Sequence, residues 1–402
     1  MDNFYSTYAD NEEEWGYSKQ DFFPVLPYYP DQINLSELFL FPKKFDKAIM
    51  YVDLRSVLQG IYVKDYVLQT ALHSTTLETS IFVATMQFLE FHKKWADINK
   101  INLDIVIFFD HGRSQYHEQI NSTYKENRGG NTFGLDELST QRFLHTITKN
   151  FGLIKSVCDK VPHVYVVRLT HCESDFIPYY LMTRNLVNTS EDVVHITYSS
   201  DKDMYQNLTI NPNSVIFQKY WKNKRILRRG QAVSNFLKTN KIVIDESWFP
   251  LILSVLGDGP DNVFGVGKIG PVRFCEIFTE LSSFFNNDPQ LLIEKIDRNE
   301  QLFDSKLYEN TKNKYIRSII ECEKEKKLIS KNMKLVSFEL LSRAFDKPKS
   351  TEILDLRRSI EETFTKKKIA ERKSISMALK KLGLNVERQL NQLYHVEQKQ
   401  EL

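Results

Sequence analysis

The chain has 402 residues, and its 54 Lys and Arg residues nearly balance 52 Asp and Glu residues, which gives a formal net charge of +2. This balance assigns no partner until the charges are located along the chain. The length accommodates one large catalytic domain with a smaller appendage, or two to three modest domains.

The sequence argues against a membrane-spanning protein and against a secreted one. No apolar run approaches the roughly 20 residues that span a bilayer, so we expect no membrane-spanning segment. The acidic run at residues 10–14 stands where a basic and then apolar leader would be expected in a secreted protein. We therefore predict a soluble protein of a reducing, cytoplasmic compartment, consistent with four scattered cysteines that lack C-x-x-C spacing, Cys158, Cys172, Cys275 and Cys322.

Four short apolar segments, each followed by an acid, alternate with helix-like segments. The first 46 residues show no sustained period, and we interpret them as an N-terminal extension. Strands are predicted at residues 48–52, 103–109, 164–169 and 193–198, and a helix at residues 77–95. The acids that follow the strands are Asp53, then Asp110, then Glu173 with Asp175, and then Asp201 with Asp203.

Strands separated by helices predict an α/β fold with a mostly parallel central sheet flanked by helices. In open sheets of this kind ligands bind beyond the carboxyl ends of the strands, so the acids are expected to converge there. After about residue 250 the strand signal gives way to short helices. From about residue 346 Lys, Arg and Glu alternate around apolar positions, which predicts a helical C-terminal extension.

A single Asp at a strand end is most often a cap or a solvated loop residue. Two acid-x-acid pairs after successive strands, with single acids after two others, instead favour metal binding. Carboxylates a few ångströms apart raise one another's pKa, so such a cluster needs cations to stay ionised. Oxygen ligands without His or Cys select Mg²⁺ or Mn²⁺. Two such ions suit phosphodiester hydrolysis, and the candidate ligands are Asp53, Asp110, Glu173, Asp175, Asp201, Asp203, Asp258 and Asp261.

An ordered set of motifs over residues 48–340 resembles the 5′-nuclease or flap-endonuclease superfamily, and more closely its bacteriophage 5′-3′ exonucleases. The pieces are Tyr51-Val-Asp53, Phe109-Asp110, Tyr124-Lys125-x-Asn127-Arg128, Glu173-Ser-Asp175, Ser199-Ser-Asp201-Lys-Asp203 and Gly257-Asp258-x-x-Asp261-Asn262-x-x-Gly265-Val-x-x-Ile269-Gly270. The last piece is the most distinctive. The resemblance implies a PIN/5′-nuclease-like α/β fold with a helix–three-turn–helix module that binds DNA.

The resemblance also implies roles for the acids and for two basic residues. Asp110, Glu173 and Asp175, with help from Asp53, would hold one Mg²⁺ ion, and the other four acids would organise a second, some through water; Mn²⁺ would substitute. Lys125 and Arg128 match basic residues of a helical gateway, here about residues 111–150, that contact the scissile phosphate and stabilise its negative charge. For Lys125 the alternative is a solvated helix face.

Two positions depart from the pattern. His117 stands where relatives commonly have Arg, and Phe176 stands where many microbial relatives have a second Asp. Arg113, in the same loop as His117, is a candidate replacement for the missing guanidinium, although its register differs. Both departures leave room for altered substrate or metal preference.

Three glycines among apolar residues precede a helix-like run at residues 272–278. Backbone N–H groups of such a turn bind phosphate without reading bases. By resemblance this is the helix–three-turn–helix element, which grips duplex DNA and often holds K⁺, and its expected DNA-binding residues are Gly265, Gly267, Lys268 and Gly270. An ordinary loop is the alternative.

Two basic runs, at residues 222–229 and 366–373, could contact nucleic acid, although such runs are usually solvated faces. We divide the chain into an N-terminal extension (1–46), a nuclease domain (47–250), a duplex-binding region (251–345) and a helical C-terminal extension (346–402).

The sequence thus predicts a monomeric Mg²⁺-dependent 5′-nuclease for DNA with 5′ flaps, nicks or RNA–DNA primers, working beside replication proteins such as a single-strand-binding protein or clamp. A viral protein of this kind would act in the host bacterial cytoplasm. The alternative is a catalytically silent protein that binds branched nucleic acid as a replication scaffold. A toxin-like PIN ribonuclease ranks last, because those domains are shorter and lack the glycine-rich module.

Overall fold

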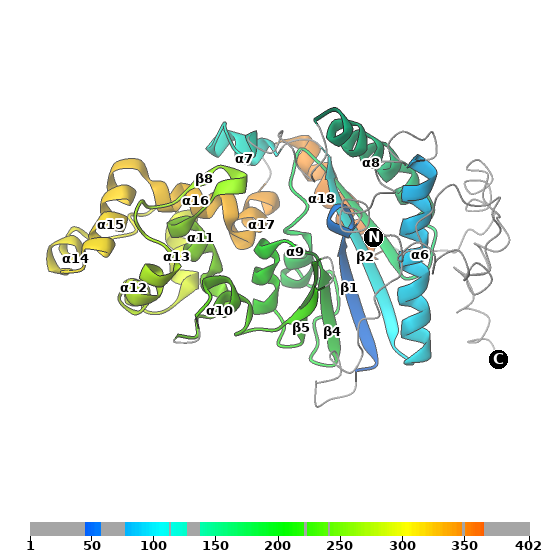
Figure 1. Cartoon of the computed structure of the whole chain (residues 1–402), viewed down its shortest axis with the longest axis horizontal. Coiled ribbons are helices and arrows are strands. Elements are labelled where there is room, and N and C mark those ends of the chain that lie inside the picture. Colours follow the sequence, from blue (N-terminus) through cyan, green and yellow to red (C-terminus); the bar gives the residue numbers. More distant parts are fainter. Residues whose placement is uncertain are drawn as a thin grey trace, which may run out of the picture.

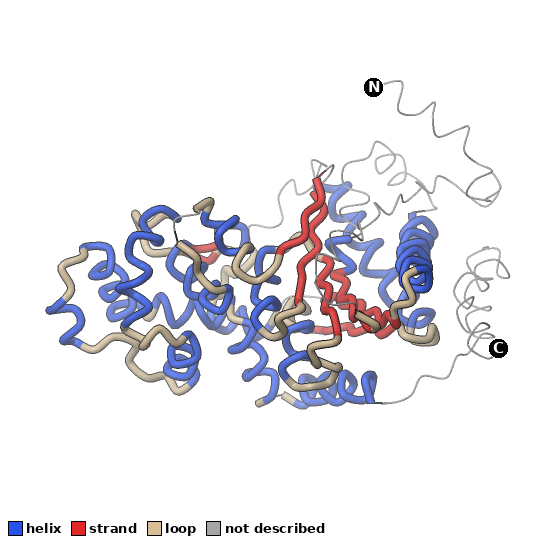
Figure 2. Tube along the Cα trace, turned by 90° about the horizontal axis from the view of Figure 1, so that it is seen from below, coloured by secondary structure: helices blue, strands red, loops and turns tan. Residues whose placement is uncertain are grey.

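The computed structural model describes residues 45–57, 77–111, 114–126, 137–220, 223–239, 242–347 and 350–365. Within these residues a six-stranded sheet has helices on both faces, and further helices form a second group beside it (Figures 1 and 2). The predicted α/β fold with a mostly parallel sheet is confirmed. Residues 1–44 of the predicted N-terminal extension, and residues 366–402 with the second basic run, lie outside the described part.

The sheet has the strand order β3-β2-β1-β4-β5-β6. Its first five strands are parallel to their neighbours, and β6 is antiparallel to β5. The four strands predicted from sequence are confirmed, whereas the last two were missed because polar residues interrupt their apolar pattern. The strands are β1 (Lys47–Asp53), β2 (Asn102–His111), β3 (Val164–Thr170), β4 (Val193–Tyr198), β5 (Ser214–Tyr220) and β6 (Asn223–Leu227).

Alternate residues of each strand point to opposite faces of the sheet, and both faces are buried. On β1, Ala48 and Met50 belong to the core beneath α6 (Leu77–Ile98) and α8 (Glu137–Cys158). Ile49 and Tyr51 belong to the larger core on the opposite face. This two-sided burial explains why the strands appear as nearly continuous apolar runs.

Helices from the middle and the end of the chain cover that second face. They include α9 (Ile177–Thr183), α17 (Phe338–Asp346) and α18 (Thr351–Thr365), together with the 3₁₀ helix η3 (Lys202–Thr209). Phe364 of α18 stacks on Tyr165 of β3 with ring centroids 5.0 Å apart. The predicted helical segment after residue 346 is therefore confirmed over α18, which packs against the sheet.

The second group of helices surrounds α11, which is apolar nearly all round and packs against α16 (Figure 1). A two-stranded hairpin of β7 and β8 and a glycine-containing turn join α11 to α12, whose N-terminal part was predicted as a helix. The elements are α10 (Ala232–Leu237), η4 (Glu246–Trp248), α11 (Phe249–Leu256), β7 (Gly257–Asp258), η5 (Gly259–Asp261), β8 (Val263–Phe264), α12 (Pro271–Ser283), α13 (Pro289–Asp297), α14 (Ser305–Asn310), α15 (Lys314–Lys326) and α16 (Leu328–Val336). Among the described residues, no helix combines the length and apolar character needed to cross a membrane.

The hairpin after α11 requires glycine at its two ends. Gly257 has a positive φ of 82°, and a Cβ atom there would lie 2.5 Å from the backbone nitrogen of Gly265. A Cβ atom on Gly265 would lie 2.4 Å from the carbonyl group of Leu256. The two backbones approach as closely as they do because neither residue carries a side chain.

We predict that Gly265→Ala lowers the free energy of unfolding by about 3 kcal/mol, because backbone atoms must shift to admit the methyl group. Gly267→Ala is the matched control: a Cβ atom there meets nothing within 4 Å, so its effect should stay within about 0.5 kcal/mol. Urea unfolding of both variants measures the difference. Equal stabilities would contradict the steric role of Gly265.

Candidate active site

The carboxyl ends of β1 and β4 are neighbours at the point where the strand order changes direction, which is where open α/β sheets bind ligands. Asp53, the last residue of β1, accepts hydrogen bonds from Ser56 N (3.1 Å) and from Ser199 Oγ (3.1 Å). Ser199 Oγ in turn accepts from Asp201 N at 3.1 Å. The Ser199 hydroxyl therefore connects Asp53, at the end of β1, with Asp201, which follows β4.

The acid-containing segment after β4 is the start of η3. The Asp201 carboxylate caps this helix by accepting a hydrogen bond from Asp203 N at 3.0 Å. Lys202 lies between these two acids, and its Nζ donates to Asp258 Oδ2 at 2.8 Å and lies 4.0 Å from Asp203 Oδ1. The Asp-Lys-Asp sequence thus contributes two carboxylates and one ammonium group, which partly neutralises the negative charge.

Three acids from two separate segments form a compact oxygen cluster. One carboxylate oxygen from each of Asp203, Asp258 and Asp261 lies within 4.8 Å of the other two. Ligand atoms around one ion at about 2.0–2.6 Å lie at most about 4–5 Å apart, so a spacing of this order is compatible with one bound divalent cation. Both Asp258 and Asp261 are buried, at 4% exposure each.

The electrostatics of the cluster are those expected for crowded carboxylates. Burial, and then the charge of Asp201, hold the pKa of Asp203 well above its ordinary value. Burial also holds the pKa of Asp175 well above that value, and Asp201, Glu173 and Asp53 act in the same direction. Although burial alone would lower the pKa of Lys202, Asp203 and Asp258 raise it above its usual value. The site has more negative charge than its lysines neutralise, which favours cation binding.

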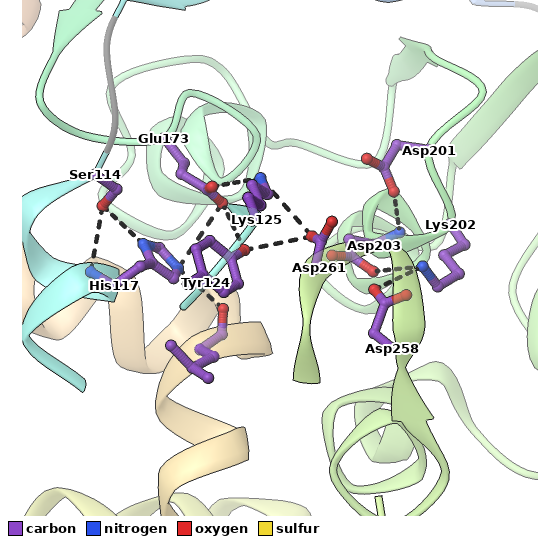
Figure 3. A network of polar contacts seen from close by, with 11 residues as sticks. Ser114, His117, Tyr124, Lys125, Glu173, Asp201, Lys202, Asp203, Asp258 and Asp261 are labelled. Atoms are coloured by element: carbon purple, nitrogen blue, oxygen red, sulfur yellow. Dashed lines mark hydrogen bonds and ion pairs between the residues drawn. The ribbon is translucent and has the colours of Figure 1, made fainter. Parts of the chain in front are cut away.

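A second polar group adjoins the oxygen cluster (Figure 3). Lys125 Nζ donates to Glu173 Oε1 and lies 3.7 Å from Asp261 Oδ2. The Tyr124 hydroxyl donates to the same two carboxylates, at 3.2 Å to Glu173 and 3.4 Å to Asp261. Asp261 therefore belongs to both groups and connects them.

His117, on α7 (Gln115–Ile120), is fully buried beside this second group. Its ring stacks on Tyr124 with centroids 4.5 Å apart. Nδ1 pairs with Ser114 Oγ at 2.7 Å, and Nε2 pairs with the carbonyl oxygen of Leu335 at 3.0 Å. Burial lowers the pKa of His117, although Glu173 opposes that shift. His117 therefore acts as a packed support for the ring of Tyr124.

Lys125 is placed by backbone contacts with the hairpin after α11. Its backbone N–H donates to the carbonyl oxygen of Asp261 at 3.1 Å. Asn121 Nδ2 donates to the carbonyl oxygen of Asn262 at 3.1 Å, and Asn262 Nδ2 donates to that of Thr123 at 2.9 Å. This reciprocal pair joins the segment that contains Tyr124 and Lys125 to the segment that contains Asp258 and Asp261.

The remaining predicted residues are placed as follows. Asp110 lies near the carboxyl end of β2, paired in register with Leu169 of β3. Arg128 and Arg113 lie outside the described residues. Phe176 is buried and packs edge-on against Tyr180 and Phe345. This position belongs to the apolar core, which explains why an aromatic residue is compatible with the fold.

The predicted DNA-binding residues lie in the turn between β8 and α12. Lys268 is exposed and has a left-handed backbone (φ 69°), and Gly270 precedes the first turn of α12. A Cβ atom on Gly267 or Gly270 would meet nothing within 4 Å, so both glycines are open to an approaching group.

The first basic run is described from residue 223 onward, where it lies on and after β6, and two of its arginines pair with side chains of this chain. Arg225 Nε donates to Gln218 Oε1 at 3.0 Å, and Arg229 Nε pairs with Asp245 Oδ2 at 2.7 Å. This part of the run therefore has a structural role.

Sequence reasoning assigned no role to Tyr124, Lys202, Gln206 or Asn332. The first two stand inside the motifs, so their position beside the acids was a usable signal. Gln206 and Asn332 are buried amides outside the quoted motifs, and their contacts become visible only in three dimensions.

A parallel sheet with acids at its carboxyl edge, adjoined by a helix–hairpin–helix segment, is the arrangement of the 5′-nuclease fold. Comparison with solved structures identifies this fold in proteins of bacteriophage T5. A flap endonuclease complex with DNA and metal ions has a TM-score of 0.52 and 18% identity, covering 79% of this chain and 100% of that one. A 5′-exonuclease with bound zinc has a TM-score of 0.52 and 20% identity, covering 79% and 99%.

A third bacteriophage T5 structure, co-crystallised with metal ions, has a TM-score of 0.51 and 17% identity, and it covers 79% of this chain and 99% of that one. No protein-family model matches the chain. No curated protein matches it in sequence. The chain therefore has a 5′-nuclease fold related to that of bacteriophage 5′-3′ exonucleases, and this likeness establishes the fold alone.

The raised pKa of Asp203 predicts how stability depends on pH. An acid with a folded-state pKa above its ordinary value of 3.8 binds more protons folded than unfolded, so stability falls as pH rises between those two values. We expect the melting temperature in EDTA to fall from pH 5 to pH 7.5, and Mg²⁺ to reduce that fall by neutralising the carboxylates. Differential scanning fluorimetry measures both.

Asp258→Asn is the diagnostic variant, because it removes one charge from the cluster while keeping the shape of the side chain. It should flatten the pH dependence in EDTA and reduce the stabilisation by Mg²⁺. An unchanged response to Mg²⁺ in this variant would show that the ion binds elsewhere.

Proposed function

We propose that the protein is a metal-dependent, structure-specific 5′-nuclease that cleaves phosphodiester bonds in DNA or RNA–DNA. The observation that carries this proposal is the convergence of carboxylates from separate segments at one edge of the sheet, with the Lys125 ammonium group among them. A protein that only bound nucleic acid would gain nothing from concentrating negative charge at this edge.

The proposal includes two hard divalent cations, because carboxylate oxygens without His or Cys ligands suit Mg²⁺, with Mn²⁺ as a substitute. Asp203, Asp258 and Asp261, supported by Asp201, would hold one ion. Glu173 and Asp175 would hold the other with Asp110, assisted by Asp53. Bound ions of this kind activate water and neutralise charge on the transferred phosphate.

Lys125 would bind the scissile phosphate. Its Nζ contacts Glu173 and Asp261, and cations at these acids would replace it as their counter-charge. The ammonium group could then turn to the phosphate oxygens, where it stabilises charge that develops during cleavage. Tyr124 would stay behind it, since its hydroxyl and its stacking on His117 fix the ring.

The duplex would lie along the turn between β8 and α12. The T5 flap endonuclease, which shares the fold, was solved with DNA. In this chain the open glycines and Lys268 offer backbone N–H groups and one positive charge, which suits contacts to phosphates. We include a K⁺ ion at the same turn in the proposal, together with DNA substrates that contain 5′ flaps, nicks or RNA primers.

A catalytically silent scaffold for branched DNA is the second candidate. One observation favours it: Phe176, where many microbial relatives of the resembled family have an acid, is committed to the apolar core and contributes no carboxylate to the edge. The two candidates differ in a single property, which is whether bound DNA is cut.

We expect single-turnover cleavage of a 5′-labelled flap duplex with Mg²⁺ and none with EDTA. Lys125→Ala should reduce the cleavage rate by about 10²–10³-fold, the usual effect of losing one group that stabilises transition-state charge. Asp258→Asn should also reduce it, because one cation ligand is lost. DNA affinity in Ca²⁺ should change little for Lys125→Ala.

Lys155→Ala is the matched control, since Lys155 also pairs with a carboxylate, Asp159 at 2.7 Å, near the end of α8 that leads into the amino end of β3. Its cleavage rate should equal that of the wild type. Tight binding of the flap duplex by the wild type without cleavage in Mg²⁺ or Mn²⁺ would support the silent scaffold instead.

We further expect Lys268→Ala to weaken duplex binding in Ca²⁺ similarly for all sequences and to reduce the slope of log affinity against log salt by about 1. Lys100→Ala is its control, because Lys100 is also exposed with a left-handed backbone (φ 57°) and precedes β2 at the opposite edge of the sheet. Fluorescence anisotropy over a salt series measures both slopes. Equal slopes would remove Lys268 from the interface.

A further inference from the structure

The end of α16 and its junction with α17 contact three of the segments that contain or support site residues, yet contribute no acid to the site. Three buried side chains make these contacts, and each reaches a different segment: Gln206, Asn332 and His117. The contacts are hydrogen bonds to backbone groups, which fix position more strictly than apolar packing does.

Gln206 joins η3 to the α16–α17 junction. Its Nε2 donates to the carbonyl oxygen of Asp203 at 3.2 Å and to that of Val336 at 2.9 Å. Its Oε1 accepts from the backbone N–H of Phe338 at 2.9 Å. Both polar atoms of this buried amide are thus used, and one contact is to the backbone of a candidate metal ligand.

Asn332 of α16 brackets the hairpin. Its Nδ2 donates to the carbonyl oxygens of Ser254 at 2.9 Å and Phe264 at 2.7 Å. These residues lie on either side of the segment that contains Asp258 and Asp261. One amide group therefore fixes the positions of both flanks of this segment relative to α16.

His117 completes the set through its contact with the carbonyl oxygen of Leu335, the residue before Val336. Through the stacked ring of Tyr124, this contact places the hydroxyl that donates to Glu173 and Asp261. Residues 332–338, a stretch of less than two helical turns, thus contact η3, the hairpin and the His117 ring that supports the Tyr124–Lys125 segment.

We propose that Gln206 and Asn332 are positioning residues, which bring the acids of η3 and of the hairpin into register against α16 so that one cation can bind both segments. The inference rests on the proposed metal site. Outer partners that orient metal ligands typically affect affinity by about 10–100-fold. Loss of either amide should therefore weaken cation binding although neither residue touches the ion.

The test uses Gln206→Met, which preserves volume and removes the three hydrogen bonds, with Mn²⁺ affinity measured by isothermal titration calorimetry. We expect the dissociation constant to rise about 10–100-fold. Asn207→Leu is the matched control: Asn207 is the adjacent buried amide of η3, and its Nδ2 donates to Thr197 Oγ1 and Met204 Sδ, away from α16. Its affinity should stay within about threefold of the wild type.

A double-mutant cycle separates positioning from general destabilisation. If Gln206 acts through the Asp203 segment, the effects of Gln206→Met and Asp203→Asn on Mn²⁺ affinity should be far from additive, whereas Asn207→Leu and Asp203→Asn should be additive. Asn332→Leu should weaken Mn²⁺ binding in the same way as Gln206→Met. Additive effects, or unchanged affinity in Gln206→Met, would overturn the inference.

The outcome remains distinct from that of the proposed function. Weakened Mn²⁺ binding in the two variants, with a wild type that cuts no DNA, would support the positioning role and reject the nuclease. A wild type that cuts DNA, with variants that bind Mn²⁺ normally, would support the nuclease and reject the positioning role. A wild type that binds no Mn²⁺ would overturn both.

Discussion

Repulsion among carboxylates that the fold gathers at one edge of the sheet is the constraint on which the rest of the structure depends. One carboxylate oxygen from each of Asp203, Asp258 and Asp261 lies within 4.8 Å of the other two. Burial and the charge of Asp201 together raise the pKa of Asp203. Lys202 and Lys125 supply positive charge from either side of Asp261 (Figure 3). Such an arrangement stores unfavourable energy in the absence of cations, so it must be held together by the surrounding structure.

That support comes from contacts distant in sequence. The hairpin after α11 holds the Tyr124–Lys125 segment by a reciprocal pair of asparagines, Asn121 and Asn262. The hairpin itself requires the close approach of Gly257 and Gly265. Since each connection fixes backbone atoms, the acids can be crowded without the loops moving apart. Rigidity at the edge is thus a property of the helical region as much as of the sheet.

The sheet was largely predictable, because a parallel strand buried on both faces leaves a continuous apolar run such as residues 48–52 or 103–109. Strands β5 and β6 escaped prediction, since Gln218 is buried in one and the other is a short basic edge strand. In the site, Asp203, Asp258 and Asp261 were predicted and lie together. The supports Gln206 and Asn332 could not be inferred, because nothing in a sequence distinguishes a buried amide with backbone partners from a solvated one.

His117 and Phe176 show how the same fold accommodates departures from a resembled pattern. Phe176 faces a core of aromatic rings, so at this position the fold gains packing where an acid would add repulsion. Burial lowers the pKa of His117, and its two ring nitrogens pair with Ser114 and Leu335, so the ring is fixed where it supports Tyr124. Both residues thus stabilise the surroundings of the site by packing, and the positive charge beside its acids comes from Lys125 and Lys202.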